Sequence, residues 1–128
     1  MTDHIGRKQF ERDVPAEATR MEYAHDLFGN LTFLNKAGEL ISGYSAQEAR
    51  CMNISQLVTP EFIGQMRELI AHMIEQGMGS VFEIDIIAKD GRPVALEVST
   101  RLVLRDGGPI EIQGIAVPSV LRGAPATL

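Results

Sequence analysis

The chain has 128 residues and a mass of 14.0 kDa, which is the size of one domain. Its formal net charge is −5 at pH 7, its pI is about 5.1, and its 12 basic residues are scattered. This balance argues against a nucleic-acid partner, because a phosphate backbone requires a basic face.

The two ends of the chain differ in composition from the middle. We expect a leader over residues 1–21, where Phe10 and Val14 have the spacing of one face of a short amphipathic helix. Residues 118–128 mix proline and glycine with small residues, which indicates a linker or the edge of an expressed segment. The predicted domain covers residues 22–117.

A β-hairpin is predicted at the start of this domain. The turn pair Gly29-Asn30 separates two apolar segments, which predicts strands over 22–28 and 31–34. Asn35 then stands where a helix N-cap is expected.

Short helical segments follow over about 36–58. Ser45 and Glu48 have the spacing of a capping box, in which each side chain bonds the backbone of the other residue. Asn53 and Gln56 repeat this spacing with amides. We therefore expect three short helices in succession.

One long helix follows them. Thr59 supplies an expected cap, Pro60 suits the first turn, and a carboxylate follows at the positive end of the helix dipole. Apolar residues then recur at helical spacing along one face: Phe62, Met66, Leu69 and Met73. Gly77 is expected to end the helix.

After Gly77 the apolar period changes from helical to two. A strand around 82–86 leads through the turn Asp90-Gly91 to a long strand that ends near residue 105. A last strand is predicted over 110–117. Helices segregated to one face of an antiparallel sheet make this an α+β domain.

The order of these motifs resembles that of a PAS domain, a sensory module common in bacterial signalling proteins. The resemblance covers about 22–117. Its motifs are Asp26 and Gly29 in the first turn, Asn35, Gly43-Tyr44-Ser45 with Glu48, Pro60-Glu61, Glu83, Lys89-Asp90-Gly91, and Gln113-Gly114-Ile115.

This resemblance implies a five-stranded antiparallel sheet that cups a small helical bundle, with a cavity between the sheet and the long helix. PAS domains are not enzymes; they bind a small molecule or dimerise, and they influence an output domain. We expect the input domain of a sensor histidine kinase, covalently linked to its output domain. The alternatives are a diguanylate cyclase, a transcriptional regulator, or an interaction module without ligand.

No cofactor is expected. Haem-binding relatives use a histidine on the long helix, but His72 falls in a polar row of that helix, and neither His25 nor His4 is expected to help. Flavin-binding relatives need an Asn-Cys-Arg motif, which is absent around Cys51. We interpret Cys51 as a small buried residue.

No catalytic or metal site is expected either. Glu83, Asp85 and Glu97 alternate with apolar residues, which predicts that they lie on the outer face of the sheet, with Arg101 beside Glu97. An enzyme would require Glu83, Glu97 and His72 to converge in one cleft, and the alternation argues against that.

The remaining candidate is an apolar ligand pocket. The long helix and two strands would supply most of its wall, and the short helices would close one side. The candidate residues are Tyr44, Met52, Ile54, Met66, Ile70, Met73, Phe82, Ile84, Leu96 and Val98. Side chains that fill this space completely are the alternative; otherwise we expect a small apolar ligand.

A homodimer is expected because apolar residues break the alternation on the outer sheet face: Ile87, Val103, Ile115 and Val117. The chain shows no signal peptide and no apolar run near the roughly 20 residues of a membrane span. A single cysteine fits a reducing compartment. We therefore expect a cytoplasmic chain that makes no membrane contact.

Overall fold

The structure of the protein is a computed structural model that describes residues 20–119. The expected leader helix around Phe10 and Val14 lies outside the described residues, as does most of the expected linker over 118–128. Within residues 20–119, no helix is long and apolar enough to cross a membrane.

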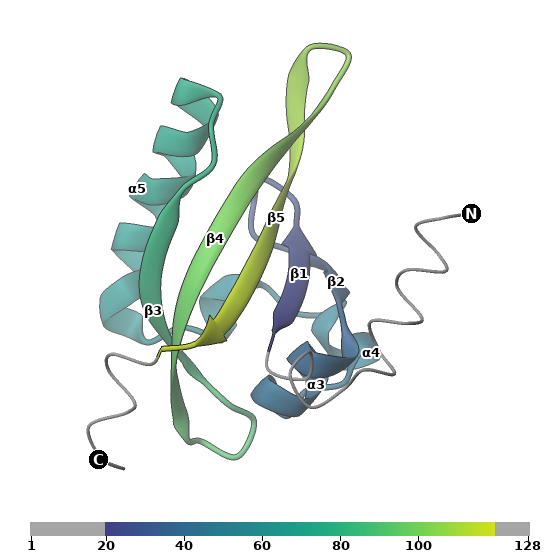
Figure 1. Ribbon diagram of the computed structural model, residues 1–128, viewed down its shortest axis with the longest axis vertical. Helices are drawn as coiled ribbons and strands as arrows, with labels where there is room; N and C mark the ends of the chain where they lie inside the picture. The colour runs from purple at the N-terminus through teal and green to yellow at the C-terminus, as the bar shows by residue number, and fades with distance from the viewer. Residues whose placement is uncertain (1–19, 120–128) are drawn as a thin grey trace.

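Five antiparallel strands form one sheet in the order β2-β1-β5-β4-β3 (Figure 1). Their bounds are Met21–His25 for β1, Leu31–Leu34 for β2, Val81–Ile87 for β3, Pro93–Arg105 for β4 and Gly108–Pro118 for β5. The predicted α+β class with a five-stranded antiparallel sheet is confirmed. The first strand begins and the last strand ends one residue outside the span 22–117.

The first hairpin forms as predicted, but β1 ends at His25, not at residue 28, and the chain turns at Leu27-Phe28, before the predicted Gly29-Asn30. The cause is Asp26, whose carboxylate accepts hydrogen bonds from the backbone N–H groups of Phe28 and Asn30, both at 2.9 Å. These bonds hold the chain in a turn, so it cannot continue the ladder.

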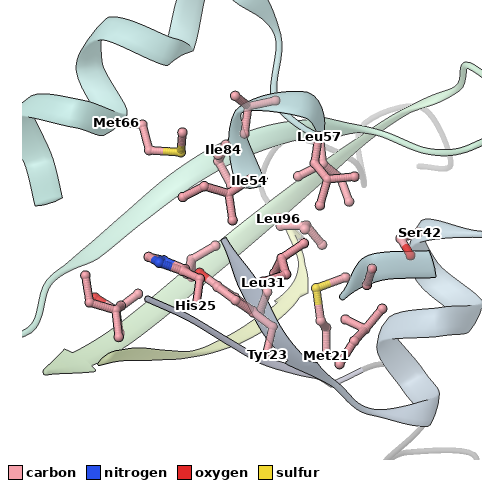
Figure 2. A pocket seen from close by; sticks show the side chains of 18 of the residues that line it. Met21, Tyr23, His25, Leu31, Ser42, Ile54, Leu57, Met66, Ile84 and Leu96 are labelled. Carbon is pink, nitrogen blue, oxygen red and sulfur yellow. The ribbon is translucent and has the colours of Figure 1, made fainter. Parts of the chain in front are cut away.

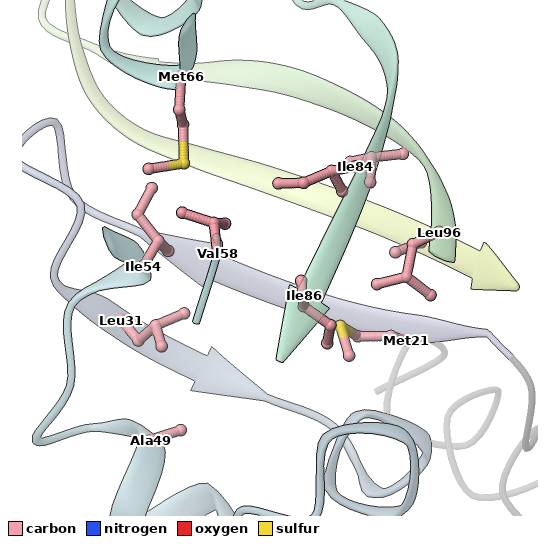
Figure 3. Close-up of a cluster of buried hydrophobic side chains, with 11 residues drawn as sticks. Met21, Leu31, Ala49, Ile54, Val58, Met66, Ile84, Ile86 and Leu96 are labelled. Carbon is pink, nitrogen blue, oxygen red and sulfur yellow. The ribbon is translucent and has the colours of Figure 1, made fainter. Parts of the chain in front are cut away.

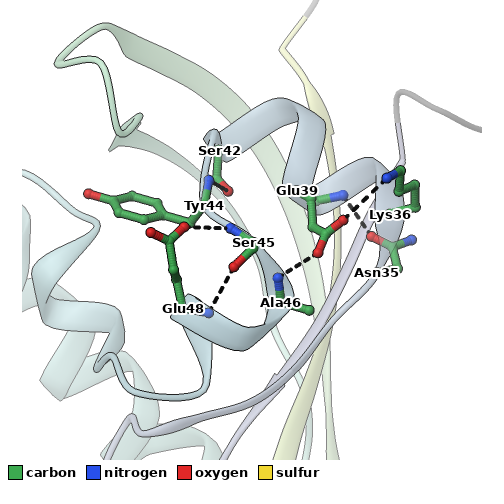
Figure 4. Close-up of polar contacts among 9 residues, drawn as sticks. Asn35, Lys36, Glu39, Ser42, Tyr44, Ser45, Ala46 and Glu48 are labelled. Atoms are coloured by element: carbon green, nitrogen blue, oxygen red, sulfur yellow. Dashed lines mark hydrogen bonds and ion pairs between the residues drawn. The ribbon is translucent and has the colours of Figure 1, made fainter.

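The three short helices form with the predicted caps. They are α3 at Lys36–Ser42, α4 at Ala46–Ala49 and the 3-10 helix η1 at Ile54–Gln56. The side chain of Asn35 accepts from Gly38 N at 2.8 Å, and both capping boxes are complete. The carboxylate of Glu39 also accepts from Ala46 N, which links α3 to α4 (Figure 4).

The long helix α5 spans Pro60–Gln76 and begins at the proline as predicted. The expected Thr59 side-chain cap is wrong, because the N–H of Phe62 that it would bind is taken by the Thr59 carbonyl at 2.9 Å. Gly77 ends the helix in a left-handed conformation, with φ of 70°, and its N–H bonds the Met73 carbonyl.

The core lies between α5, the short helices and the inner face of the sheet. Figure 3 shows Met66 of α5 opposite Ile84 of β3 and Leu96 of β4. Ile54 of η1 and Val58, which lies between η1 and α5, pack beside them. All five side chains are buried, so the predicted helical stripe and strand alternation are confirmed.

Candidate ligand-binding cavity

An internal cavity of about 70 Å³ lies between the inner face of the sheet and the helices (Figure 2). The structure brings all ten predicted pocket residues to its wall: Tyr44, Met52, Ile54, Met66, Ile70, Met73, Phe82, Ile84, Leu96 and Val98. The interior is therefore not completely filled. Whether these residues bind a ligand stays a prediction.

The wall of the cavity is mostly aliphatic and methionine surface. Four methionines line it: Met21, Met52, Met66 and Met73. Methionine has three rotatable bonds and adapts to irregular shapes. The volume is about half of the ~150 Å³ that admits benzene in an engineered apolar cavity. A larger guest would therefore require these methionine side chains to move.

Sequence reasoning missed the two aromatic polar residues on the wall, Tyr23 and His25. Side chains alternate along β1, so Met21, Tyr23 and His25 share the inner face. His25 is only 3% exposed and lines the cavity, although from the sequence it was considered only as a haem ligand and was assigned no place in the pocket. The spacing of Tyr23 and His25 from Met21 was the available signal.

The environment of His25 defines its hydrogen-bonding state. Its Nδ1 lies 2.7 Å from the Asp26 carbonyl oxygen, which can only accept, so we assign the proton to Nδ1. Burial lowers the pKa of His25, and the hydrogen bond to Asp26 and the charges of Asp26 and Glu111 oppose this effect only in part. The imidazole is therefore neutral at neutral pH, with Nε2 as an acceptor.

Tyr23 lies beside His25 at one end of the cavity (Figure 2). The two rings are stacked with centroids 6.0 Å apart and an interplanar angle of 16°. Tyr23 covers Gly114 of β5, where a Cβ atom would come within 2.3 Å of the Tyr23 Cζ. Burial raises the pKa of Tyr23, so its hydroxyl stays protonated and can donate a hydrogen bond.

Two other polar side chains of the wall are already engaged within the fold. The Ser42 hydroxyl accepts from Tyr44 N at 3.1 Å. The Thr100 hydroxyl accepts from Ser80 N and lies 3.0 Å from the Ser80 carbonyl oxygen, which ties β4 to the chain before β3.

Outside the cavity, the prediction for His72 is confirmed and the prediction for Cys51 is wrong. His72 is exposed on α5, as predicted. Cys51 is exposed, so the expectation of a small buried residue is wrong. Cys51 follows the end of α4, and Ala49 occupies the buried position of that helix.

The carboxylates Glu83, Asp85 and Glu97 lie on the outer face of the sheet, as predicted. Glu83 pairs with Glu97 across β3 and β4, on the opposite face from Ile84 and Leu96. The sheet therefore separates Glu83 and Glu97 from α5 and His72, and the three do not converge.

The expected contact between Arg101 and Glu97 is wrong. Arg101 donates to the Gln113 side chain of the neighbouring strand instead, at 2.9 and 2.7 Å. In the part of the chain from residue 20 to 119, no group of three His, Cys, Asp or Glu residues is arranged to hold a metal ion.

Comparison with protein families decides which family has this architecture. The family model described as the PAS fold matches residues 31–116. The chain belongs to the PAS family. This PAS domain is thus a sensory and signalling module of a family without catalytic activity of its own.

Solved PAS domains share its fold. A PAS domain from Colwellia psychrerythraea is 21% identical with a TM-score of 0.75, over 90% of this chain and 98% of that chain. A domain of a sensory box sensor histidine kinase/response regulator from Geobacter sulfurreducens is 23% identical with a TM-score of 0.66, over 87% and 93%.

A ligand-bound structure is also similar. The PAS domain of the Cronobacter turicensis RpfR quorum-sensing receptor, in complex with C12:0, is 19% identical with a TM-score of 0.69, over 82% of this chain and 98% of that chain. At these identities the likeness shows the fold alone. No curated protein matches the sequence.

Proposed function

We propose that this PAS domain senses a small, predominantly apolar molecule that binds in the internal cavity. The observation that carries the proposal is the cavity of about 70 Å³. Its wall includes four flexible methionines, and none of the Asp, Glu, Lys or Arg residues among residues 20–119 lines it. The complex of the Cronobacter PAS domain with C12:0 supports an aliphatic guest in this fold.

Signalling would follow from a shift in population between two packings of α5 against the sheet. Met66 and Met73 of α5 line the cavity together with Ile84 and Leu96 of the sheet, so a guest that displaces the two methionines would favour a different position of the helix. An output domain attached to this chain would respond to that change. The Geobacter neighbour supports a sensor histidine kinase as the parent protein.

Absorbance and mass spectrometry test the ligand directly. We expect the purified chain to be colourless, without haem or flavin, and to release a small apolar molecule when it is denatured. Adding that molecule back should raise the unfolding free energy with its concentration. A protein whose stability responds to no released or added apolar molecule would contradict the proposal.

We also propose that the domain forms a homodimer through the outer face of the sheet. Ile115 is 44% exposed there, and Ile87, Val103 and Val117 lie on the same face. Ile115→Lys and deletion of residues 1–20 should both lower the association constant measured by sedimentation. Leu40→Lys, at a 64% exposed position on α3, is the matched control and should leave it unchanged.

The outer face also supports a second candidate function, an interaction module that needs no ligand. The two functions are distinguished by Ile115→Lys, which should abolish the role of an interaction module but leave ligand binding in the cavity intact.

A further inference from the structure

Two polar atoms at one end of the cavity have no hydrogen-bond partner among residues 20–119. They are the Nε2 of His25 and the hydroxyl oxygen of Tyr23. Every fully buried side-chain nitrogen and oxygen atom in that range does have a partner. These two atoms therefore keep surface that a water-sized atom can touch, and both side chains line the cavity.

The two atoms offer complementary hydrogen bonds. His25 Nε2 is an acceptor because Nδ1 carries the proton that bonds the Asp26 carbonyl. The Tyr23 hydroxyl can donate. A hydroxyl group on a guest both donates and accepts, so it would satisfy both atoms at once.

The rest of the wall argues for an uncharged guest with an aliphatic body. In the described part of the chain no Asp, Glu, Lys or Arg lines the cavity, so a charged head group would be buried without a partner. Ser42 and Thr100 bond within the fold. The remaining surface is mostly aliphatic and methionine.

We propose that His25 and Tyr23 form the head-group site for a short aliphatic alcohol. His25 Nε2 accepts the hydrogen of the alcohol, Tyr23 donates to its oxygen, and the aliphatic chain lies against Met66 and Met73. This inference rests on the proposed function, since it specifies the class of guest that the cavity takes.

The cavity volume selects suitable probes. About 70 Å³ is half of what admits benzene, so the guest is short, or else the methionines move. Butan-1-ol is therefore the test ligand. Methyl propyl ether has the same atoms without the O–H donor, and butanoate carries a charge at the same chain length.

Tyr23→Phe is the decisive variant. It removes only the hydroxyl, which has no partner within the described fold, so the folded protein should keep its stability. Thr32→Val is the matched control, because it also removes a single hydroxyl group, at an exposed position of β2 that does not line the cavity.

The measurement is an NMR titration of the full chain with ¹⁵N-labelled histidine. Butan-1-ol should move the Nε2 resonance of His25, and it should bind about five-fold more weakly to Tyr23→Phe than to the wild type. Thr32→Val should bind it like the wild type. The ether should bind the wild type about five-fold more weakly than the alcohol.

Three results would overturn the head-group site while leaving the proposed function intact. They are equal binding of the alcohol by Tyr23→Phe and the wild type, equal binding of the ether and the alcohol, and tighter binding of butanoate than of the alcohol. If none of the three probes binds and no apolar molecule is released on denaturation, the proposed function fails as well.

Discussion

Substituting alanine at Gly114 should force Tyr23 away from its position over β5. The added Cβ would come within 2.3 Å of Tyr23 Cζ and within 2.5 Å of Cε1 and the hydroxyl oxygen. Carbon atoms in contact lie about 3.5–4.0 Å apart, so the overlap exceeds about 1 Å and the ring must move.

The cavity limits the cost of this movement. Overpacking a well-packed core costs ~1–3 kcal/mol. The ring can shift into the adjacent space of about 70 Å³, which is larger than a methyl group. Alanine also reduces the conformational entropy of the unfolded chain relative to glycine, which returns ~0.4–1 kcal/mol. We therefore expect Gly114→Ala to lower the unfolding free energy by about 1–2 kcal/mol.

Gly64→Ala is the matched control, because Gly64 lies on the exposed side of α5 and a Cβ there meets nothing within 4 Å. This variant should gain about 0.5–1 kcal/mol from helix propensity. Urea denaturation followed by circular dichroism measures both changes. A Gly114→Ala protein as stable as the wild type would refute the position assigned to Tyr23.

Three further predictions concern the cavity wall. Met66→Ala should lower the free energy of unfolding by about 3 kcal/mol, of which ~2 kcal/mol comes from lost apolar burial and ~1 kcal/mol from the enlarged cavity. In the same urea assay, His72→Ala should change the free energy of unfolding by no more than about 0.5 kcal/mol. Ile70→Phe should stay within about 1 kcal/mol, because the cavity accepts the extra volume; a larger loss would mean that the space is not available. Burial lowers the folded pKa of His25, so its contribution to stability is complete above the unfolded value of 6.5 and is lost as the pH falls through the lower folded pKa. Urea midpoints at pH 7.5 and 5.5 should show this loss, and His25→Phe should reduce it.

Local signals in the sequence were sufficient for most of the secondary structure. The capping boxes at Ser45 and Asn53, and the glycine that ends α5, involve residues within a few positions of each other. Their hydrogen bonds therefore depend little on the rest of the chain. The failure at Thr59 is also local, because the backbone carbonyl competes with the side chain for the same N–H.

The candidate site was predictable only in its apolar part. The apolar spacing of a strand or a helix predicts which of its faces is buried. Met66, Ile84 and Leu96 were therefore correctly assigned to the same core. The polar end was missed although Met21, Tyr23 and His25 alternate along β1, because a strand of five residues is too short for this alternation alone to decide which face is buried. The orientation of His25 is evident only once β1 pairs with β5.

The amino-acid sequence by itself determined the order of the elements, the apolar face of the long helix and of strands β3 and β4, and the family, because these depend on spacing along the chain. Only the tertiary structure decided that Tyr23 stacks on His25, that Arg101 bonds Gln113, and that Cys51 faces outward. Those contacts depend on strand register and on the volume left between distant elements. The cavity is the volume between the sheet and the helices that their side chains do not fill. That volume depends on how the whole domain packs.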